Sequence, residues 1–169
     1  SYTVTQGTKS GSASVNITVN PVNDSPVINA ASTIAVNENT KAVGTISTSD
    51  VDTGDTLELT LGGTDASSFE LSSANALTFI TAPDFETKTS YSLTFSLTDG
   101  TLTSTKDITI NVTNLNDVAP TISSATSFTI DENELAIGTL TIVDPEGGTF
   151  TYTAAGTDGS LINISAAGV

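Results

Sequence analysis

The sequence predicts an all-β protein built from antiparallel sandwiches, and three observations support this. Thr, Ser, Val, Ile and Asn dominate the composition, while aromatic residues make up only 5% of the chain. β-Branched residues favour strands, and Ser and Asn favour turns. Apolar residues recur at every second position in short runs, and no segment shows the 3.6-residue spacing of an amphipathic helix. We therefore expect short strands separated by turns, and almost no helix.

Four runs of alternating apolar residues predict half-buried strands in the middle of the chain. Because such alternation is typical of a sandwich core, we assign all these side chains to packing and none to function. The stretch TDGTLTS at 98–104 separates the last two runs and predicts a hairpin. In chain order the runs are Leu57, Leu59 and Leu61; Leu77 and Phe79; Tyr91, Leu93, Phe95 and Leu97; and Ile108, Ile110 and Val112.

The sequence repeats itself at a spacing of 93 to 94 residues. NPVNDSPVI at 20–28 returns as NLNDVAP at 114–120, and SASVNITVNPVND at 12–24 matches TKDITINVTNLND at 105–117. AVNENTKAVGTISTSDVD at 35–52 matches TIDENELAIGTLTIVDPE at 129–146. TDASSFELS at 64–72 matches TDGSLINIS at 157–165.

The repeat divides the chain into three parts. Residues 1–26 are predicted to be the last strands and linker of one unit, 27–119 a complete unit, and 120–169 the first half of a further unit. A unit of about 93 residues is large enough to bury a core of its own. We expect the chain to be a section of a longer tandem array.

Composition excludes several classes of function. The chain has no Cys and no His, which rules out a disulfide, a thiolate zinc site and imidazole catalysis. Its 19 acidic residues against four basic ones give a net charge of −15, which disfavours nucleic acid and acidic membranes as partners. No apolar run approaches membrane-spanning length, so we expect no membrane insertion.

A set of acidic and amide residues lies at predicted strand ends and turns rather than within strands. The turns of a sandwich gather at its two poles. We expect the VNEN, PDFE and NLND motifs to reach one pole of the complete unit and the SDVD and LTDG motifs to reach the other. The residues concerned are Glu38, Asp84, Glu86, Asn116 and Asp117 at the first pole, and Asp50, Asp52 and Asp99 at the second.

These motifs resemble, in order and spacing, the cadherin-type repeats of large bacterial surface adhesins. VNEN resembles the family's Glu-Asn motif, SDVD its Asp-x-Asp motif, PDFE its Asp-x-Glu motif, and NLNDVAP its linker. The resemblance covers the whole chain. It implies tandem seven-stranded antiparallel Greek-key sandwiches of the cadherin/immunoglobulin-like type, one complete and two partial. It also implies an extracellular or cell-surface location, on a bacterium.

The resemblance further implies calcium at the junctions between units, each ion shared by facing poles. Ca²⁺ prefers six to eight oxygen ligands from carboxylates, amides and backbone carbonyls, which one pole alone does not offer. The junction after the complete unit would use Glu38, Asp84, Glu86, Asn116, Asp117, Asp144 and Glu146, with backbone carbonyls of Leu115 and Val118. The junction before it would use Asn23, Asp24, Asp50, Asp52 and Asp99.

We expect fewer ligands at the first junction. Gln6 stands where Asp99 falls in the complete unit, and the preceding unit's Glu and Asp-x-Glu lie outside the sequence. Glu146 replaces the second Asp of its motif, which predicts weaker binding or fewer ions at the second junction. Asp55, Asp65 and Asp158 are interpreted as turn formers.

The hypothesis that follows is a calcium-rigidified spacer of a secreted or cell-surface adhesin, with neighbouring repeats as its first partners. A filament subunit is one alternative, in which residues 1–20 of one chain complete the half-unit of another by strand exchange. A module that binds a surface polysaccharide or matrix is another, although the chain has no Trp and three Tyr. A glycosidase-like carboxylate pair at Asp84 and Glu86 has no predicted substrate cleft, so we expect no enzyme.

Overall fold

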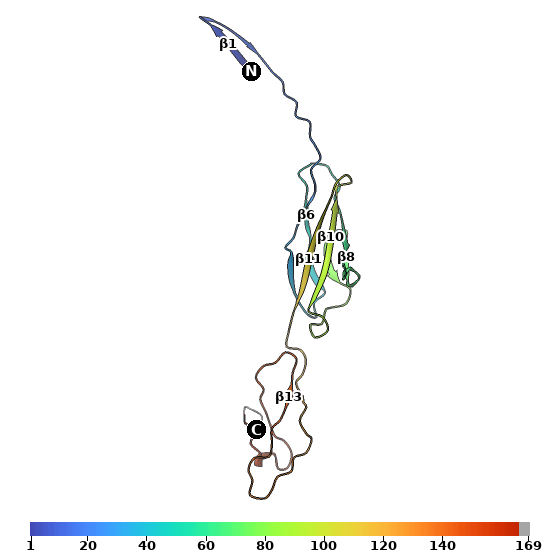
Figure 1. Cartoon of the computed structure of the whole chain (residues 1–169), viewed down its shortest axis with the longest axis vertical. Helices are drawn as coiled ribbons and strands as arrows, with labels where there is room; N and C mark the ends of the chain where they lie inside the picture. Colours follow the sequence, from blue (N-terminus) through green and yellow to red (C-terminus); the bar gives the residue numbers. More distant parts are fainter. Residues whose placement is uncertain (166–169) are drawn as a thin grey trace.

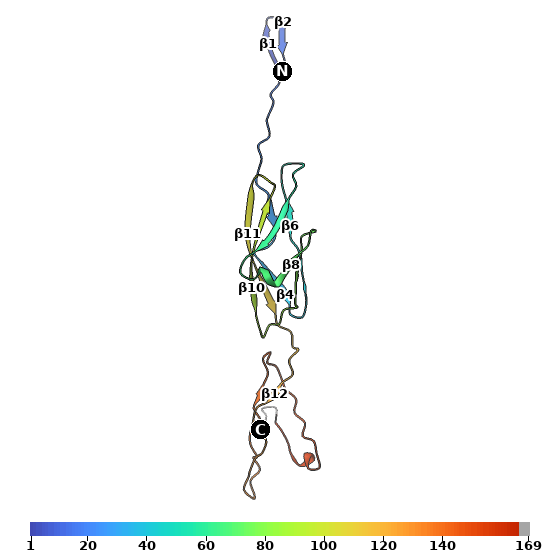
Figure 2. The same cartoon turned by 90° about the vertical axis from the view of Figure 1, so that its right-hand side faces the viewer.

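The computed structural model describes residues 1–165 and shows an elongated molecule with three consecutive parts along one axis. A small N-terminal hairpin, a central sandwich and a looser C-terminal segment follow one another (Figure 1). The view turned by 90° keeps the same order and the same narrow outline (Figure 2). The two terminal parts therefore lie at opposite ends of the molecule.

The described residues contain thirteen strands, two short 3₁₀ helices and no α-helix. The N-terminal part contains β1 (Tyr2–Gln6) and β2 (Lys9–Ala13). The C-terminal part contains β12 (Thr121–Ile122), β13 (Ile142–Val143) and η2 (Gly159–Leu161). The central part contains β3 (Val27–Asn29), β4 (Thr33–Asn37), β5 (Ala42–Thr45), β6 (Ser47–Ser49), β7 (Glu58–Gly62), η1 (Ala66–Ser68), β8 (Phe69–Leu71), β9 (Ala76–Phe79), β10 (Ser90–Thr98) and β11 (Thr103–Thr113).

The strands of the central part pair into two main sheets. One has the order β4-β11-β10-β7 and the other β5-β9-β8, with β3 and β6 as a separate pair. β10 and β11 form the longest ladder, from Ser90 opposite Asn111 to Thr98 opposite Thr103. The hairpin expected at 98–104 is therefore present, and the all-β prediction is confirmed.

The observed sandwich differs from the expected one in strand number and in one pairing. Residues 27–113 contain nine strands rather than seven, because a three-residue gap separates β3 from β4 and a single residue separates β5 from β6. β4 also runs parallel to β11, whereas every other pair is antiparallel. The break after β3 lets the chain leave β6 and join the edge of the other sheet beside β11, which runs in the same direction as β4.

The alternating apolar residues form the core, as their spacing predicts. Among the described residues, all the buried apolar side chains lie between residues 26 and 112, so only the central part has a closed core. Phe69, Phe79 and Tyr91 add an aromatic group with ring centroids 4.2 to 5.5 Å apart. Each fully buried side chain of this size contributes about 1.5–3 kcal/mol to folding. The buried hydrophobic residues that form this core are Ile28, Val36, Ile46, Phe69, Leu77, Phe79, Leu93, Phe95, Leu97, Ile108, Ile110 and Val112.

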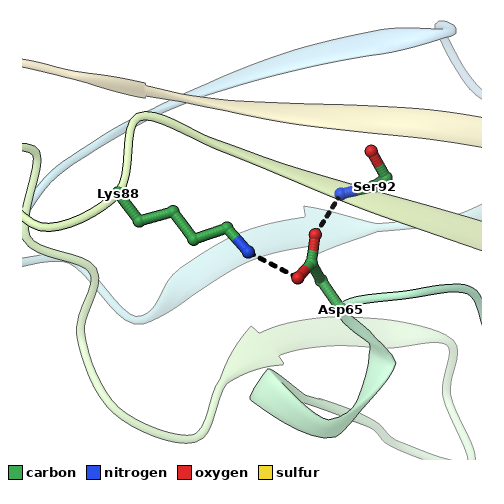
Figure 3. A network of polar contacts seen from close by, with 3 residues as sticks. All are labelled: Asp65, Lys88 and Ser92. Atoms are coloured by element: carbon green, nitrogen blue, oxygen red, sulfur yellow. Dashed lines mark hydrogen bonds and ion pairs between the residues drawn. The ribbon is translucent and has the colours of Figure 1, made fainter.

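Asp65 does more than form a turn, because it joins η1 to the start of β10. Its carboxylate accepts hydrogen bonds from the Ser92 backbone N–H at 2.8 Å and from Lys88 Nζ at 2.5 Å (Figure 3). Lys88 also lies 4.6 Å from the ring centroid of Tyr91. The hydrogen bond from Lys88 lowers the pKa of Asp65, and the bond from Ser92 adds to this.

The terminal parts reproduce local features of the central part at the repeat spacing. β12 and β13 pair Thr121 with Val143 and Ile122 with Ile142. The equivalent residues of β3 and β6, 94 positions earlier, pair in the same register. η2 follows η1 at a spacing of 93, and each is preceded by an Asp in the same backbone conformation. The division of the chain into three units at 26 and 119 stays a prediction.

No helix among residues 1–165 is long and apolar enough to cross a membrane.

Candidate metal centres

Three groups of carboxylates converge at the ends of the central sandwich. In each group one oxygen per residue lies within 4.8 Å of the others. Two groups share Glu86 at the end nearest the C-terminal part, and the third lies at the opposite end. The groups are Glu38, Asp84 and Glu86; Glu86, Asp117 and Glu146; and Asp50, Asp52 and Asp55.

Glu38 is the one buried charged residue in the part of the chain that the structure describes, and only 1% of its surface is exposed. It follows directly after β4. Its Oε1 accepts a hydrogen bond from Leu115 N at 2.6 Å, and its Oε2 accepts one from Phe85 N at 2.9 Å. A single carboxylate thus holds together the end of β4, the PDFE connection and the linker after β11. Each oxygen keeps a further lone pair for another partner.

The PDFE connection folds around Asp84. Asp84 Oδ1 accepts from Glu86 N at 3.0 Å, and Oδ2 accepts from Thr87 Oγ1 at 2.8 Å. The hydrogen bond from Thr87 lowers the pKa of Asp84. Desolvation raises the pKa of Glu86, and the charges of Glu38 and Glu146 raise it further. Crowded carboxylates of this kind favour a shared cation.

Glu146 reaches back from the C-terminal part to the linker. Its Oε1 accepts hydrogen bonds from Asp117 N at 3.0 Å and Val118 N at 2.9 Å. These two backbone donors lower its pKa, that of Asp117 having the larger effect. Asp117 Oδ2 accepts a hydrogen bond from Asn39 Nδ2. The group therefore combines the central sandwich, the linker and the following segment.

Asp144 supports Glu146 from within its own turn. Asp144 Oδ1 accepts hydrogen bonds from Glu146 N and Gly147 N, both at 3.0 Å. At the other end of the sandwich Asp50 Oδ1 accepts from Asp52 N at the same distance. The Asp-x-Asp and Asp-x-Glu motifs therefore adopt the same turn, 94 residues apart.

The opposite pole gathers the acids of the SDVD motif together with the first linker. Asp24 N donates to Asp52 Oδ2 at 2.7 Å. Asp55, which the sequence assigned to a turn, belongs to this group. Desolvation raises its pKa, and the charges of Asp50, Asp52 and Asp99 raise it further.

Asp99 joins this pole through the β10–β11 turn. Its Oδ1 accepts from Thr101 N at 2.6 Å and Leu102 N at 2.7 Å, while Oδ2 accepts from Asn23 Nδ2 at 2.9 Å. The bond from Leu102 is the largest cause of its lowered pKa. Asn23 and Asp99 thus contact each other as the sequence grouped them, but Asn23 uses its donor rather than its carbonyl oxygen.

The donor atoms fit a hard divalent cation. Both poles consist of carboxylate oxygens with neighbouring amide and backbone oxygens, which are the ligands that Ca²⁺ prefers. Asp50 Oδ2 and Glu146 Oε2 are buried and have no hydrogen-bond partner among the described residues. Buried polar atoms normally have partners, so two orphaned carboxylate oxygens at the two poles point to a cation as the missing partner.

Some of the proposed ligands stand apart from these groups. Asn116 has an exposed side chain in the linker. Leu115 and Val118 act in the structure through their N–H groups, and their role as carbonyl ligands stays a prediction. Sequence reasoning missed Asn39 and Asp55. The sequence did contain a sign of Asn39, because Asn133 repeats it in the following unit. In the structure both residues adopt a positive φ, of 62° and 67°.

Comparison with known proteins agrees with this architecture. Residues 23–113 match the family model described as Bacterial Ig domain. No curated protein sequence is a detectable relative. The resemblance to cadherin-like modules is confirmed at the level of the fold.

Three solved structures illustrate the likeness. Human protocadherin-24 EC1-2 superposes with a TM-score of 0.73 at 20% identity, covering 87% of this chain and 76% of that one. Drosophila N-cadherin EC1-4 gives a TM-score of 0.61 at 22% identity, covering 75% of this chain and 35% of that one. The human desmocollin-1 ectodomain gives 0.57 at 23% identity, covering 73% and 27%.

Proposed function

The chain belongs to the bacterial Ig domain family, and from this and its acidic poles we propose that it is a calcium-rigidified, non-enzymatic spacer of an extracellular adhesin. The observation that carries the proposal is the meeting of Glu86, Asp117 and Glu146 within 4.8 Å. These residues come from the central sandwich, the linker and the next segment. A cation held there would connect parts of the chain that otherwise meet at a flexible joint.

Electrostatic repulsion explains why the joint depends on the cation. Without a counter-ion the carboxylates at the joint repel one another, and the segments separate about the linker. A bound Ca²⁺ supplies the positive charge that the acids share. The carboxylates then need to stay together to complete its coordination, which restricts the hinge.

The pole beside the first linker holds a second cation in this proposal, but more weakly. Asp50, Asp52 and Asp55 supply its carboxylates, and Asp24 contributes to the same pole. Asp99 and Asn23 already bond to each other there. The repeat counterpart of Asp99 in the N-terminal part is Gln6, so that part offers no matching carboxylate.

Small-angle X-ray scattering tests the stiffening. The protein is measured in EDTA and in calcium at about 10⁻³ M, the concentration range in which extracellular modules bind this ion. We expect a longer maximum dimension and a more rigid profile with calcium. Identical profiles under the two conditions would reject the proposed function.

A double variant gives the test its specificity. Asp84→Asn with Glu146→Gln removes charge on both sides of the joint and should abolish most of the calcium response. Glu70→Gln is the matched control, because Glu70 is an exposed acid on β8 outside the three groups. A full response in the double variant would place the hinge cation elsewhere.

Adhesion benefits from a spacer that is stiff. A stiff rod keeps a distal binding domain away from the cell surface, whereas a flexible chain collapses toward it. Binding of a polysaccharide or matrix by this segment itself stays a prediction, which a glycan array can test.

A further inference from the structure

The turn after β4 places one neutral polar side chain among the carboxylates of the joint. Asn39 follows Glu38 in this turn and has a φ of 62°, a left-handed conformation that glycine adopts most easily. Asn tolerates this conformation better than most residues do. Because glycine would serve the backbone at least as well, an amide at this position indicates a use for the side chain.

The backbone of this turn is held by two neighbouring segments. Asn39 N donates a hydrogen bond to Pro83 O at 2.9 Å, and Glu38 N donates one to Thr113 O at 3.1 Å. Pro83 opens the PDFE motif, and Thr113 is the last residue of β11. The Asn39 side chain therefore projects from a turn whose position is fixed by the sandwich itself.

The amide of Asn39 reaches the linker. Its Nδ2 donates a hydrogen bond to Asp117 Oδ2, across 78 positions of sequence. Asp117 is the one linker residue in its group with Glu86 and Glu146, and its backbone N–H donates to Glu146 Oε1 at 3.0 Å. Asp117 is thus held from the central sandwich through its side chain and from the following segment through its backbone.

The bond between Asn39 and Asp117 contributes little to folding, but it orients a carboxylate. Both side chains are exposed, and an exposed hydrogen bond replaces bonds to water with little net gain. A side chain that moves freely has to be immobilised when it becomes a ligand, and this ordering weakens binding. A carboxylate that is already oriented avoids that loss.

The amide also leaves the charge of the carboxylate available. An ammonium group beside Asp117 would offset its charge and compete with a divalent cation. The lysines nearest in sequence bond elsewhere: Lys41 Nζ donates to Ile80 O at 2.7 Å, and Lys88 Nζ donates to Asp65 Oδ1 at 2.5 Å. In the described part of the chain no lysine forms an ion pair with the three carboxylate groups.

The opposite pole contains the same kind of bridge with the partners exchanged. There the amide belongs to the linker and the carboxylate to the sandwich, since Asn23 Nδ2 donates to Asp99 Oδ2 at 2.9 Å. A neutral amide therefore connects the linker to the sandwich through a carboxylate at both poles. This recurrence favours a common role for the two bridges.

We propose that Asn39 is a positioning residue for the cation at the joint. Its amide holds the Asp117 carboxylate beside Glu86 before the ion arrives, and the ion then meets a ligand that is already in place. Asn39 acts through Asp117 and is not itself a ligand. The inference rests on the proposed calcium function, because it concerns how that same site is prepared.

Calcium titration calorimetry of the whole chain tests this role. Asn39→Gly removes the amide and keeps the left-handed turn. Asn133→Gly is the matched control, because Asn133 has a φ of 67° at the same position of the repeat, and its side chain bonds to no other described residue. The signal of the joint is the part that is lost in the double variant Asp84→Asn with Glu146→Gln. We expect the joint to bind calcium about 2- to 10-fold more weakly in Asn39→Gly than in Asn133→Gly.

Urea denaturation in EDTA separates positioning from folding. We expect equal midpoints for Asn39→Gly and Asn133→Gly, because each removes one exposed side chain at a positive φ. Weaker calcium binding at an unchanged midpoint supports the proposal. A lower midpoint for Asn39→Gly would show that the bond stabilises the fold, and it would overturn the proposal.

Nuclear magnetic resonance in EDTA tests whether the bond forms before the ion binds. The side-chain amide signal of Asn39 is identified by its loss in Asn39→Gly. We expect its proton to be shifted downfield in the wild-type chain, and to return to the position of a free amide in Asp117→Ala. The amide of Asn133 serves as the reference in the same spectrum. A free-amide signal for Asn39 in the wild-type chain would contradict the proposal.

The calorimetry distinguishes this inference from the proposed function. If the wild-type chain binds no calcium, the proposed function is rejected and the inference with it. If the wild-type chain binds calcium and Asn39→Gly binds it as tightly as Asn133→Gly, only the inference is rejected.

Discussion

At the scale of the residue, the most consequential side chain is a carboxylate that behaves as part of the core. Glu38 is almost fully buried, and both of its oxygens accept backbone hydrogen bonds from segments 47 and 77 residues away. Burial of a charge is costly unless hydrogen bonds compensate it. Glu38 is therefore needed for the shape of the pole before any cation binds.

We expect Glu38→Ala to lower the free energy of unfolding by about 2–4 kcal/mol, because it leaves the N–H groups of Phe85 and Leu115 without their acceptors and empties a buried site. Urea denaturation in EDTA measures this without a contribution from metal. Glu132→Ala is the control, since Glu132 occupies the matching position of the C-terminal part with an exposed side chain and should change stability by less than about 0.5 kcal/mol. Equal effects would mean that Glu38 acts only through its charge.

Asp65 gives a prediction that depends on pH. Its pKa is lowered from 3.8, chiefly by the hydrogen bond from Lys88, so the unfolded chain takes up this proton more readily than the folded one. Its stabilising contribution is therefore present above about pH 3.8 and is lost as pH falls through the lowered pKa. Asp65→Ala should cost about 1–2 kcal/mol at pH 7.

This cost should shrink as the pH falls below 3.8, which urea denaturation at a series of pH values can follow. Asp158→Ala is the matched control, because Asp158 precedes η2 as Asp65 precedes η1. No basic residue lies in its part of the chain. A pH-independent cost of Asp65→Ala would show that the ion pair contributes nothing.

At the scale of the element, the connection after β7 depends on the closeness of two backbones. Gly63 has a φ of +100°, and a β carbon there would lie 2.7 Å from Thr94 N and 2.9 Å from Leu93 Cα. Those atoms belong to β10, one of the two inner strands of the four-stranded sheet. Neither can move without disturbing the ladder, so the turn requires glycine for space as well as for its dihedral angle.

Gly63→Ala should therefore destabilise the protein more than Gly100→Ala. Gly100 has a φ of +96° and nothing within 4 Å of an added β carbon, so it isolates the dihedral cost of about 1–2 kcal/mol. The backbone clash at Gly63 should add about 1–3 kcal/mol. The urea midpoints of the two variants measure the difference. Equal midpoints would show that β10 shifts to admit the β carbon without a measurable loss of stability.

At the scale of the whole molecule, we expect the acidic poles and the net charge of −15 to make the shape of the chain depend on the ions around it. Monovalent salt and calcium should act differently. Salt at 1 M shortens the Debye length to about 3 Å and screens the repulsion, but it does not bridge carboxylates. Calcium does both.

We expect scattering in EDTA with 1 M NaCl to show a flexible chain that is more compact than at low salt. Millimolar calcium should give a stiff, extended chain instead. If 1 M NaCl produced the same stiffening as calcium, simple screening would explain the joint and coordination would be unnecessary.

The sequence predicted the elements of the central part well, because its signals are local. Alternating residues such as Leu93, Phe95 and Leu97 identified β10 and its buried face, and the Asp-Gly pair at 99–100 identified the hairpin. It also grouped Glu38 with Asp84 and Glu86, which the structure brings together, while their role as metal ligands stays a prediction. It missed Asp55, since one side chain in a turn carries no sign of its distant neighbours, and it missed Asn39 although Asn133 repeats that residue.

By itself the sequence determined the strand class, the repeat and the types of oxygen donor, because periodicity and turn chemistry act over a few residues. Only the tertiary structure decided that β4 pairs in parallel with β11, that Glu38 is held by two backbone donors, and that Glu146 bonds back to the linker. These contacts join residues 28 to 77 positions apart. They exist only once the sheets have paired, so short-range patterns could not encode them.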